Sequence, residues 1–282
     1  LALSLRLYCP VLMSVKSEII DGVAVLNLAN PPVNALSVAL RQGLLDSVKA
    51  ALNDNSVCSI VLIGAGSTFP AGADITEFNG PSLLLGPKLN EICPFLEESS
   101  KPVVAAIHGT ALGGGFEIAL SCHYRVAVPA AKVGLPEVNI GILPGAGGTQ
   151  RLPRCVGVKA ALKLVVGGAP IGAAEALKLG ALDEIIPSAK ELKAEAVKFA
   201  LAKARGIAAR KEEGGVQDLP RLSLKPVPWG TVDGFKSKSH ALQACEAFKR
   251  AQPHEALGGL AKRKCVDAVA AAVLAGDDDA AG

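Results

Sequence analysis

The sequence has few aromatic residues, almost no charge imbalance and no long apolar run. Phe, Trp and Tyr make up 4% of its 282 residues, and 29 basic residues stand against 26 acidic ones, a formal net charge of +3. A nucleic-acid surface needs a basic cluster and stacking rings, so this composition argues against nucleic acid as a partner. The mean hydropathy of +0.37 is high, but no stretch reaches the roughly 18 apolar residues of a membrane-spanning helix. The sequence therefore predicts no membrane span.

Several signatures of cofactor, metal and nucleophile sites are also absent. The sequence contains no CxxC, HExxH or GxSxG and no Gly-Lys dipeptide, which argues against a zinc site, a hydrolase nucleophile and a phosphate-binding P-loop. Three glycine clusters resemble dinucleotide loops, but Phe69, Ile118 and Gln150 stand where the third glycine belongs. We therefore expect no metal and no NAD site in this chain.

The cysteines and histidines are read as structural. The seven cysteines are odd in number and widely spaced, which fits reduced thiols in an intracellular compartment better than a disulfide framework. Cys122 is followed by His123, but adjacent side chains point away from each other, so Cys122 is read as a small buried hydrophobic residue. His108 ends an apolar strand and is read as a core histidine.

Strand and helix patterns alternate in the first half of the chain, which predicts an α/β layered domain. Ser37 is a candidate N-cap for a helix with apolar residues at helical spacing. The predicted strands cover residues 23–28, 59–63, 103–107 and 125–128. Irregular helix is expected over 82–98, regular helix over 159–166, 173–179, 190–204, 239–250 and 256–274, and an irregular linker over 211–236.

Two glutamates stand among apolar neighbours near a run of glycines. Gly113–Gly115 precede a predicted helix, whose exposed N–H groups suit a developing negative oxygen. Glu117 falls in the first turn of that helix, and Glu137 is set among apolar residues further along. This pattern favours acid–base chemistry on a polarised carbonyl. Two alternatives stay open: Glu117 as a helix-start cap, and Glu137 in a salt bridge with Arg151 or Arg154.

Four segments together resemble the crotonase (enoyl-CoA hydratase/isomerase) superfamily. They are NPPVNALS at 30–37, FPAGADI at 69–75, KPVVAAIHGTALGGGFEIALSCHYRVA at 101–127 and VGLPEVNIGILPGAGGTQRLPR at 133–154. The likeness extends over about residues 14–205, and the motifs occur in the family's order. The resemblance implies an α/β fold, a spiral of ββα units, with a C-terminal helical extension. It also implies that the substrate is a coenzyme A thioester and that no further cofactor is needed.

The resemblance assigns roles to five residues. The backbone N–H groups of Ala73 and Gly114 would form an oxyanion hole for the thioester oxygen, and the backbone at Ala71 would contact the CoA adenine. Glu117 would help to deprotonate the attacking water, and Glu137 would deliver a proton to C2. Members that only isomerise commonly keep just the second glutamate, so the presence of both favours enoyl-CoA hydration, with Δ3-to-Δ2 isomerisation as a second activity.

One branch of the family fits best, in which a hydratase/isomerase half precedes an NAD-dependent dehydrogenase half. On that basis residues 1–12 are read as a non-native or upstream leader, 13–205 as the catalytic domain and 206–238 as a linker. Residues 239–282 are read as a helical segment that leads towards an absent dehydrogenase half. This branch implies fatty-acid β-oxidation in the peroxisome, although residues 280–282 are not an SKL-type address.

Other readings of assembly and function stay open. The resemblance implies either a homo-oligomer such as a trimer or, in a longer form, packing against the chain's own dehydrogenase half. The alternative functions are an isomerase-only member of the family and a non-catalytic acyl-CoA-binding fragment.

Overall fold

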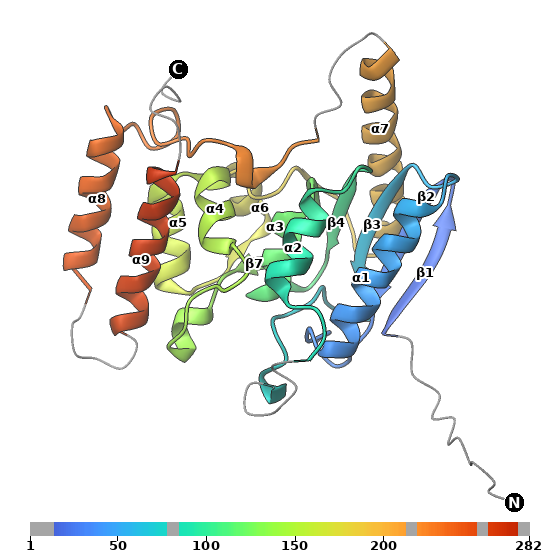
Figure 1. Ribbon diagram of the computed structural model, residues 1–282, viewed down its shortest axis with the longest axis horizontal. Coiled ribbons are helices and arrows are strands. Elements are labelled where there is room, and N and C mark those ends of the chain that lie inside the picture. The colour runs from blue at the N-terminus through green and yellow to red at the C-terminus, as the bar shows by residue number, and fades with distance from the viewer. Residues whose placement is uncertain (1–13, 78–84, 213–218, 253–258, 276–282) are drawn as a thin grey trace, which may run out of the picture.

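One large sheet with helices on both faces organises the protein (Figure 1). The computed structural model describes residues 14–77, 85–212, 219–252 and 259–275, so the predicted leader lies outside the described residues. Six described strands form the sheet in the order β1-β2-β3-β4-β6-β9, with β1 antiparallel to β2 and every other neighbour parallel. Their bounds are Val15–Ile20, Val23–Leu28, Ser59–Gly64, Val103–Ile107, Tyr124–Ala127 and Glu184–Ile185.

The central strands β2, β3 and β4 are buried along almost their whole length. Helix α1, Val38–Asn53, packs against β1 and β2, and helix α7, Leu192–Glu212, packs against β2, β3 and β4. Figure 1 shows α1 in front of the sheet and α7 behind it. Because both faces are covered, these strands read as continuous apolar runs, which is why the sequence located them.

A second, smaller sheet is built from segments that alternate along the chain with the last strands of the first sheet. It consists of β5 (Thr110–Leu112), β7 (Lys132–Gly134) and β8 (Ile171–Gly172), with β5 and β7 parallel and β8 antiparallel to β7. The remaining helices are α2 Leu89–Glu97, α3 Gly114–Ser121, α4 Gly148–Val156, α5 Val158–Gly167, α6 Ala173–Lys178, α8 Lys238–Arg250 and α9 Gly259–Leu274. Short 3₁₀ turns are η1 Ile75–Glu77, η3 Glu137–Ile140 and η4 Leu222–Leu224. This arrangement confirms the predicted α/β fold class.

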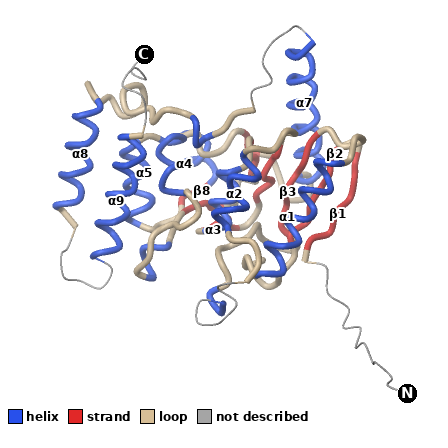
Figure 2. The backbone as a smooth tube through the Cα atoms, viewed as in Figure 1, coloured by secondary structure: helices blue, strands red, loops and turns tan. Residues whose placement is uncertain are grey.

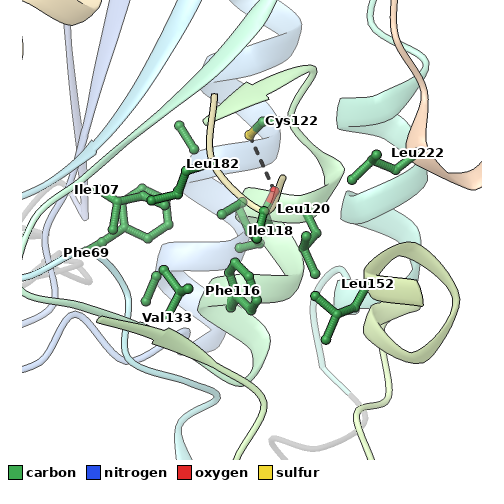
Figure 3. Close-up of a cluster of buried hydrophobic side chains, with 14 of the residues drawn as sticks. Phe69, Ile107, Phe116, Ile118, Leu120, Cys122, Val133, Leu152, Leu182 and Leu222 are labelled. Atoms are coloured by element: carbon green, nitrogen blue, oxygen red, sulfur yellow. Dashed lines mark hydrogen bonds between the residues drawn. The ribbon is translucent and has the colours of Figure 1, made fainter. Parts of the chain in front are cut away.

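Helix α3 lies at the centre of the core, with all eight of its residues buried. Figure 3 shows Phe116, Ile118 and Leu120 of this helix among Ile107 of β4 and Leu152 of α4. Protein interiors pack at nearly crystalline density, so a helix enclosed in this way has little freedom to move. The first turn of α3 is therefore held rigidly, and so are the backbone groups at the N-terminal end of this helix.

The C-terminal part of the described chain packs onto the region around α4 and α5. Helix α9 contacts α4, α5 and η3 (Figure 1). Residues 219–236 have little regular structure, as predicted, and Figure 2 shows them mostly as loop. They nevertheless bury Trp229 and Phe235, and Asp233 accepts hydrogen bonds from the N–H groups of Val158 (2.6 Å) and Lys159 (3.2 Å) at the start of α5. Hydrogen bonds and buried side chains thus hold this segment against the start of α5.

Most predicted elements are present with small shifts at their ends. Ser37 caps α1 by accepting a hydrogen bond from Leu40 N–H at 3.3 Å. The irregular helix expected over 82–98 begins only at Leu89, with Pro94 inside it, and residues 82–84 lie outside the described residues. The helix predicted over 190–204 extends to Glu212. Strand β1 was not predicted from the sequence, because four of its six residues are exposed.

Candidate active site

A cavity of about 630 Å³ opens where the loops at the start of α3, η3 and α4 meet. It is lined from several elements at once, which is the usual form of a small-molecule site. All five residues that the resemblance singled out line it: Ala71, Ala73, Gly114, Glu117 and Glu137. The structure therefore brings together, at one site, residues that are up to 66 positions apart in the sequence.

The N–H groups of Ala73 and Gly114 both lie at this cavity. Gly114 is the first residue of α3, and a Cβ placed on it would lie 3.7 Å from Ala73 N and 2.6 Å from Leu89 Cδ1. A side chain at this position would require Leu89 to move. Among the described residues neither N–H has a hydrogen-bond partner, so both are available to an oxygen at the N-terminal end of the helix dipole.

Glu117 is held firmly from one side. Its side chain is buried, and its Oε1 accepts hydrogen bonds from the N–H groups of Ala146 and Gly148, each at 2.8 Å. Burial raises the pKa of this carboxyl, and the two backbone hydrogen bonds and the charge of Arg151 act against that rise. Glu117 does cap a helix, as the alternative reading proposed, but the helix is α4 and not its own.

The carboxylate of Glu137 is held by fewer hydrogen bonds than that of Glu117. Its Oε2 is buried without a hydrogen-bond partner among the described residues. Burial, together with the nearby charge of Glu117, raises the pKa of Glu137 to about 7. The alternative of a salt bridge to Arg151 or Arg154 is wrong, because Arg151 pairs with Glu97 at 2.8 Å and Arg154 donates to Gln150 O at 2.7 Å.

The surroundings of Glu137 differ from the sequence expectation in one respect. Val138 is buried, but Ile140 is 63% exposed and lines the cavity together with Ile142 and Leu143. Apolar residues after Glu137 were expected to bury the carboxylate, whereas these three form a wall of the cavity. Other lining residues that sequence reasoning missed are Arg41, Glu77, Lys88, Asn90 and Asn139. No local pattern marks them, because α1, η1, α2 and η3 meet only in the folded chain.

The residues read as structural behave accordingly. Cys122 is buried and donates a hydrogen bond from its Sγ to Ile118 O at 3.4 Å (Figure 3). Burial raises its pKa to about 12, so the thiol stays protonated. His108 is buried, with its Nε2 3.1 Å from Gly66 O. All described cysteines are free thiols. Within the described ranges no group of three metal-ligating side chains occurs and no helix is long and apolar enough to cross a membrane.

The sequence family described as enoyl-CoA hydratase/isomerase matches residues 18–211, more than half of the chain. This chain belongs to the enoyl-CoA hydratase/isomerase family. Among curated relatives, the peroxisomal bifunctional enzyme of Danio rerio is 44% identical over 255 residues, which cover 90% of this chain and 32% of that protein. A probable enoyl-CoA hydratase of Bacillus subtilis is 47% identical over 190 residues, 63% of this chain and 72% of that protein. The chain thus spans only about a third of the bifunctional relative.

Solved structures of the family share the fold. An enoyl-CoA hydratase of Bacillus anthracis superimposes with a TM-score of 0.62 at 25% identity, covering 91% of this chain and 90% of the other. An enoyl-CoA hydratase subunit of Geobacillus kaustophilus gives a TM-score of 0.62 at 33% identity, covering 90% and 88%. Both structures thus match a larger share of this chain than residues 18–211 alone.

Proposed function

We propose that this family member is an enoyl-CoA hydratase, which adds water to a trans-2-enoyl-CoA to give a 3-hydroxyacyl-CoA, with Δ3-to-Δ2 isomerisation as a second activity. One observation carries the proposal. The buried carboxylate of Glu117, held by backbone N–H groups, and the partly buried carboxylate of Glu137, whose Oε2 has no partner among the described residues, line one cavity. Two backbone N–H groups without a partner in the described part of the chain lie at the same cavity. Polarised carbonyl chemistry needs both parts of this arrangement.

The thioester oxygen would accept hydrogen bonds from Ala73 and Gly114 N–H. As water attacks C3, negative charge moves to this oxygen and forms an enolate. Fixed donors stabilise that charge more than they stabilise the neutral carbonyl, and one such donor is typically worth about 3 kcal/mol in the transition state. The adenine end of the CoA would lie near Ala71, whose N–H donates to Val33 O at 3.2 Å, so its carbonyl would make that contact.

The two glutamates would divide the proton transfers. Glu117 keeps Oε1 in two backbone hydrogen bonds, so its Oε2 would accept a proton from the water while the water oxygen bonds to C3. Glu137, whose raised pKa of about 7 leaves it partly protonated near neutral pH, would give a proton to C2 as the enolate collapses. The net result is one water added across the double bond. Glu117 has then gained one proton and Glu137 has lost one, and exchange of these protons with solvent returns both carboxyl groups to their starting states.

Isomerisation would need only the second glutamate. Glu137 as a carboxylate would remove a proton from C2 of a 3-enoyl-CoA, the oxyanion hole would hold the dienolate, and the same carboxyl would return the proton at C4. The names of the bifunctional relatives support a role in peroxisomal fatty-acid β-oxidation for this chain. We propose the acyl-CoA as its partner molecule, with a homo-oligomer or a dehydrogenase half of a longer form as the open alternatives for assembly.

Purified chain tested with crotonoyl-CoA and with a 3-enoyl-CoA separates this proposal from its alternatives. Loss of the enoyl absorbance with formation of 3-hydroxyacyl-CoA supports hydration. Conversion of the 3-enoyl-CoA alone indicates an isomerase-only enzyme. Binding of acyl-CoA without turnover of either compound indicates a non-catalytic binding fragment and overturns the proposal.

A further inference from the structure

Behind the cavity lies an ion pair that the proposed chemistry does not use directly. Arg151 of α4 is 5% exposed and Glu97 of α2 is 3% exposed. The Nε and Nη2 groups of Arg151 both donate to Glu97 Oε2, at 3.0 and 2.8 Å. Burial alone raises the pKa of Glu97, but hydrogen bonds from Arg151 and from Ser223 N–H hold it below its usual value, so the pair is ionised. Two charges have been taken out of water at this point.

A buried ion pair is weak support for stability, because the desolvation of two charges opposes their attraction. Its place in the fold suggests a different role. The remaining nitrogen of the guanidinium, Nη1, donates to the carbonyl oxygen of Ala146 at 2.9 Å. The guanidinium of Arg151 therefore bonds both to Glu97 of α2 and to the loop that precedes α4.

That loop is the one that holds Glu117. The carbonyl bound by Arg151 lies, along the chain, between the two N–H groups that bind Glu117 Oε1, those of Ala146 and Gly148. Gly147, between them, has a φ of +92°, and a Cβ there would collide with Arg151 Nη1. The loop is thus fixed in a conformation in which the guanidinium fills the space beside Gly147.

We propose that Arg151, oriented by Glu97, is a positioning residue that holds the loop before α4 so that Ala146 and Gly148 aim both N–H groups at Glu117. The inference rests on the proposed function. It assigns to Arg151 an effect on hydration, which uses Glu117, that is larger than its effect on isomerisation, which needs only Glu137. A purely structural ion pair would affect both reactions alike.

The test uses Arg151→Lys, which keeps the positive charge but cannot reach Glu97 and the Ala146 carbonyl together as the planar fork does. The hydration kcat is expected to fall roughly tenfold to a hundredfold, since misplacement of a catalytic group by about 1 Å has this effect. KM and the isomerisation kcat change less. In a ¹³C titration, with the Glu117 carboxyl assigned through Glu117→Gln, the Glu117 pKa rises in Arg151→Lys.

The matched control is Arg154→Lys, one turn further along α4. Arg154 is also largely buried, but its hydrogen bonds among the described residues go to Gln150 of its own helix, so both activities and the Glu117 titration should stay as in the parent protein. If Arg151→Lys does not fold, Glu97→Gln replaces it, and a fall in the ratio of hydration to isomerisation is again expected. An unchanged ratio and an unchanged Glu117 titration, even with a lower Tm, overturn the positioning role.

Failure of the proposed function gives a different result. In that case the parent protein itself neither hydrates nor isomerises, while the ¹³C titration of Glu117 in Arg151→Lys still decides whether Arg151 acts on this carboxyl.

Discussion

Glu117 and Glu137 line one cavity, yet the protein treats the two carboxylates in opposite ways. Glu117 projects from a fully buried helix and has one oxygen fixed by two backbone N–H groups at 2.8 Å. Glu137 lies in a short 3₁₀ turn, and its buried Oε2 has no partner among the described residues. The two carboxylates thus differ in their hydrogen bonds. Backbone N–H groups of the protein orient Glu117, whereas Oε2 of Glu137 stays available to a substrate.

This difference has a chemical consequence. Hydrogen bonds to a carboxylate favour its charged form, and burial without them favours the neutral form. Burial raises the pKa of both carboxyls, and at Glu117 two backbone hydrogen bonds and the charge of Arg151 act against that rise. The hydrogen bonds orient Glu117 as a base, and Glu137, with its pKa raised to about 7, is suited to exchange a proton in either direction near neutral pH. Two groups of the same residue type gain separate roles from their environments alone.

The largest effect is expected from Glu117→Gln. Without the base, the hydration kcat should fall by about 10³-fold to 10⁴-fold, near the upper end of what one positioned acid or base contributes. The isomerisation kcat should fall much less, because that reaction uses Glu137. Steady-state assays with crotonoyl-CoA and a 3-enoyl-CoA measure both. Equal losses in the two reactions would show that the glutamates do not divide the work.

Glu137→Gln should damage both reactions, by about 10²-fold or more. Each of them needs a proton delivered to or removed from carbon next to the enolate, and the amide can do neither. The same pair of assays applies, with binding of the product 3-hydroxyacyl-CoA as the control for an intact cavity. Full isomerase activity in this variant would contradict the assignment of Glu137 as the proton shuttle.

Two glycines allow each glutamate to be disturbed without changing its chemistry. A Cβ on Gly148 would lie 3.0 Å from Cγ and Oε1 of Glu117, and a Cβ on Gly113 would lie 3.1 Å from Oε1 of Glu137. Gly148→Ala should therefore lower hydration roughly tenfold with a smaller effect on isomerisation. Gly113→Ala should lower both, and also the Tm, because Gly113 has a φ of +51°.

Gly167→Ala is the matched control for this pair. A Cβ at Gly167, at the end of α5, would meet nothing within 4 Å, so both activities should be unchanged. If Gly148→Ala lowers hydration and isomerisation by the same factor, the disturbance is not confined to Glu117.

Much of the fold was predictable because its central strands are buried on both faces. The runs at 23–28, 59–63 and 103–107 are apolar almost throughout, and each became a strand of the main sheet. The edge strand β1 was missed because its exposed residues show no apolar alternation. The strands β8 and β9 have two residues each. Strands this short are defined by their pairing with neighbouring strands in the fold, so no local sequence pattern marks them.

The candidate site was likewise predictable only in part. Its motifs located Glu117, Glu137 and the glycines, because these residues sit in segments typical of the family. The partners that set their environments lie far away in sequence: Glu97 is 54 residues from Arg151. The sequence left open a salt bridge of Glu137 with Arg151 or Arg154, and only the folded structure shows that the Arg151 guanidinium pairs with Glu97 of another helix.

The last expected effect concerns stability rather than activity and follows from the buried Oε2 of Glu137, which has no partner among the described residues. Its pKa is raised from 4.5 to about 7 in the folded protein, so the native state binds this proton more tightly than the unfolded chain does. The free energy of unfolding therefore falls as the pH rises from about 4.5 to about 7, and the penalty is complete above that range. At 1.36 kcal/mol per pKa unit, the penalty is no more than about 3.4 kcal/mol.

Glu137→Gln should remove this penalty. In urea unfolding the variant should be more stable than the parent at about pH 8 and equal to it at about pH 4, even though its activity is lost. Glu184→Gln, which changes an exposed glutamate, should show no such pH-dependent gain. A Glu137→Gln protein that gains no stability at the higher pH would mean that this carboxyl finds a partner in solution. The contrast between the two glutamates would then rest on hydrogen bonds to Glu117 alone.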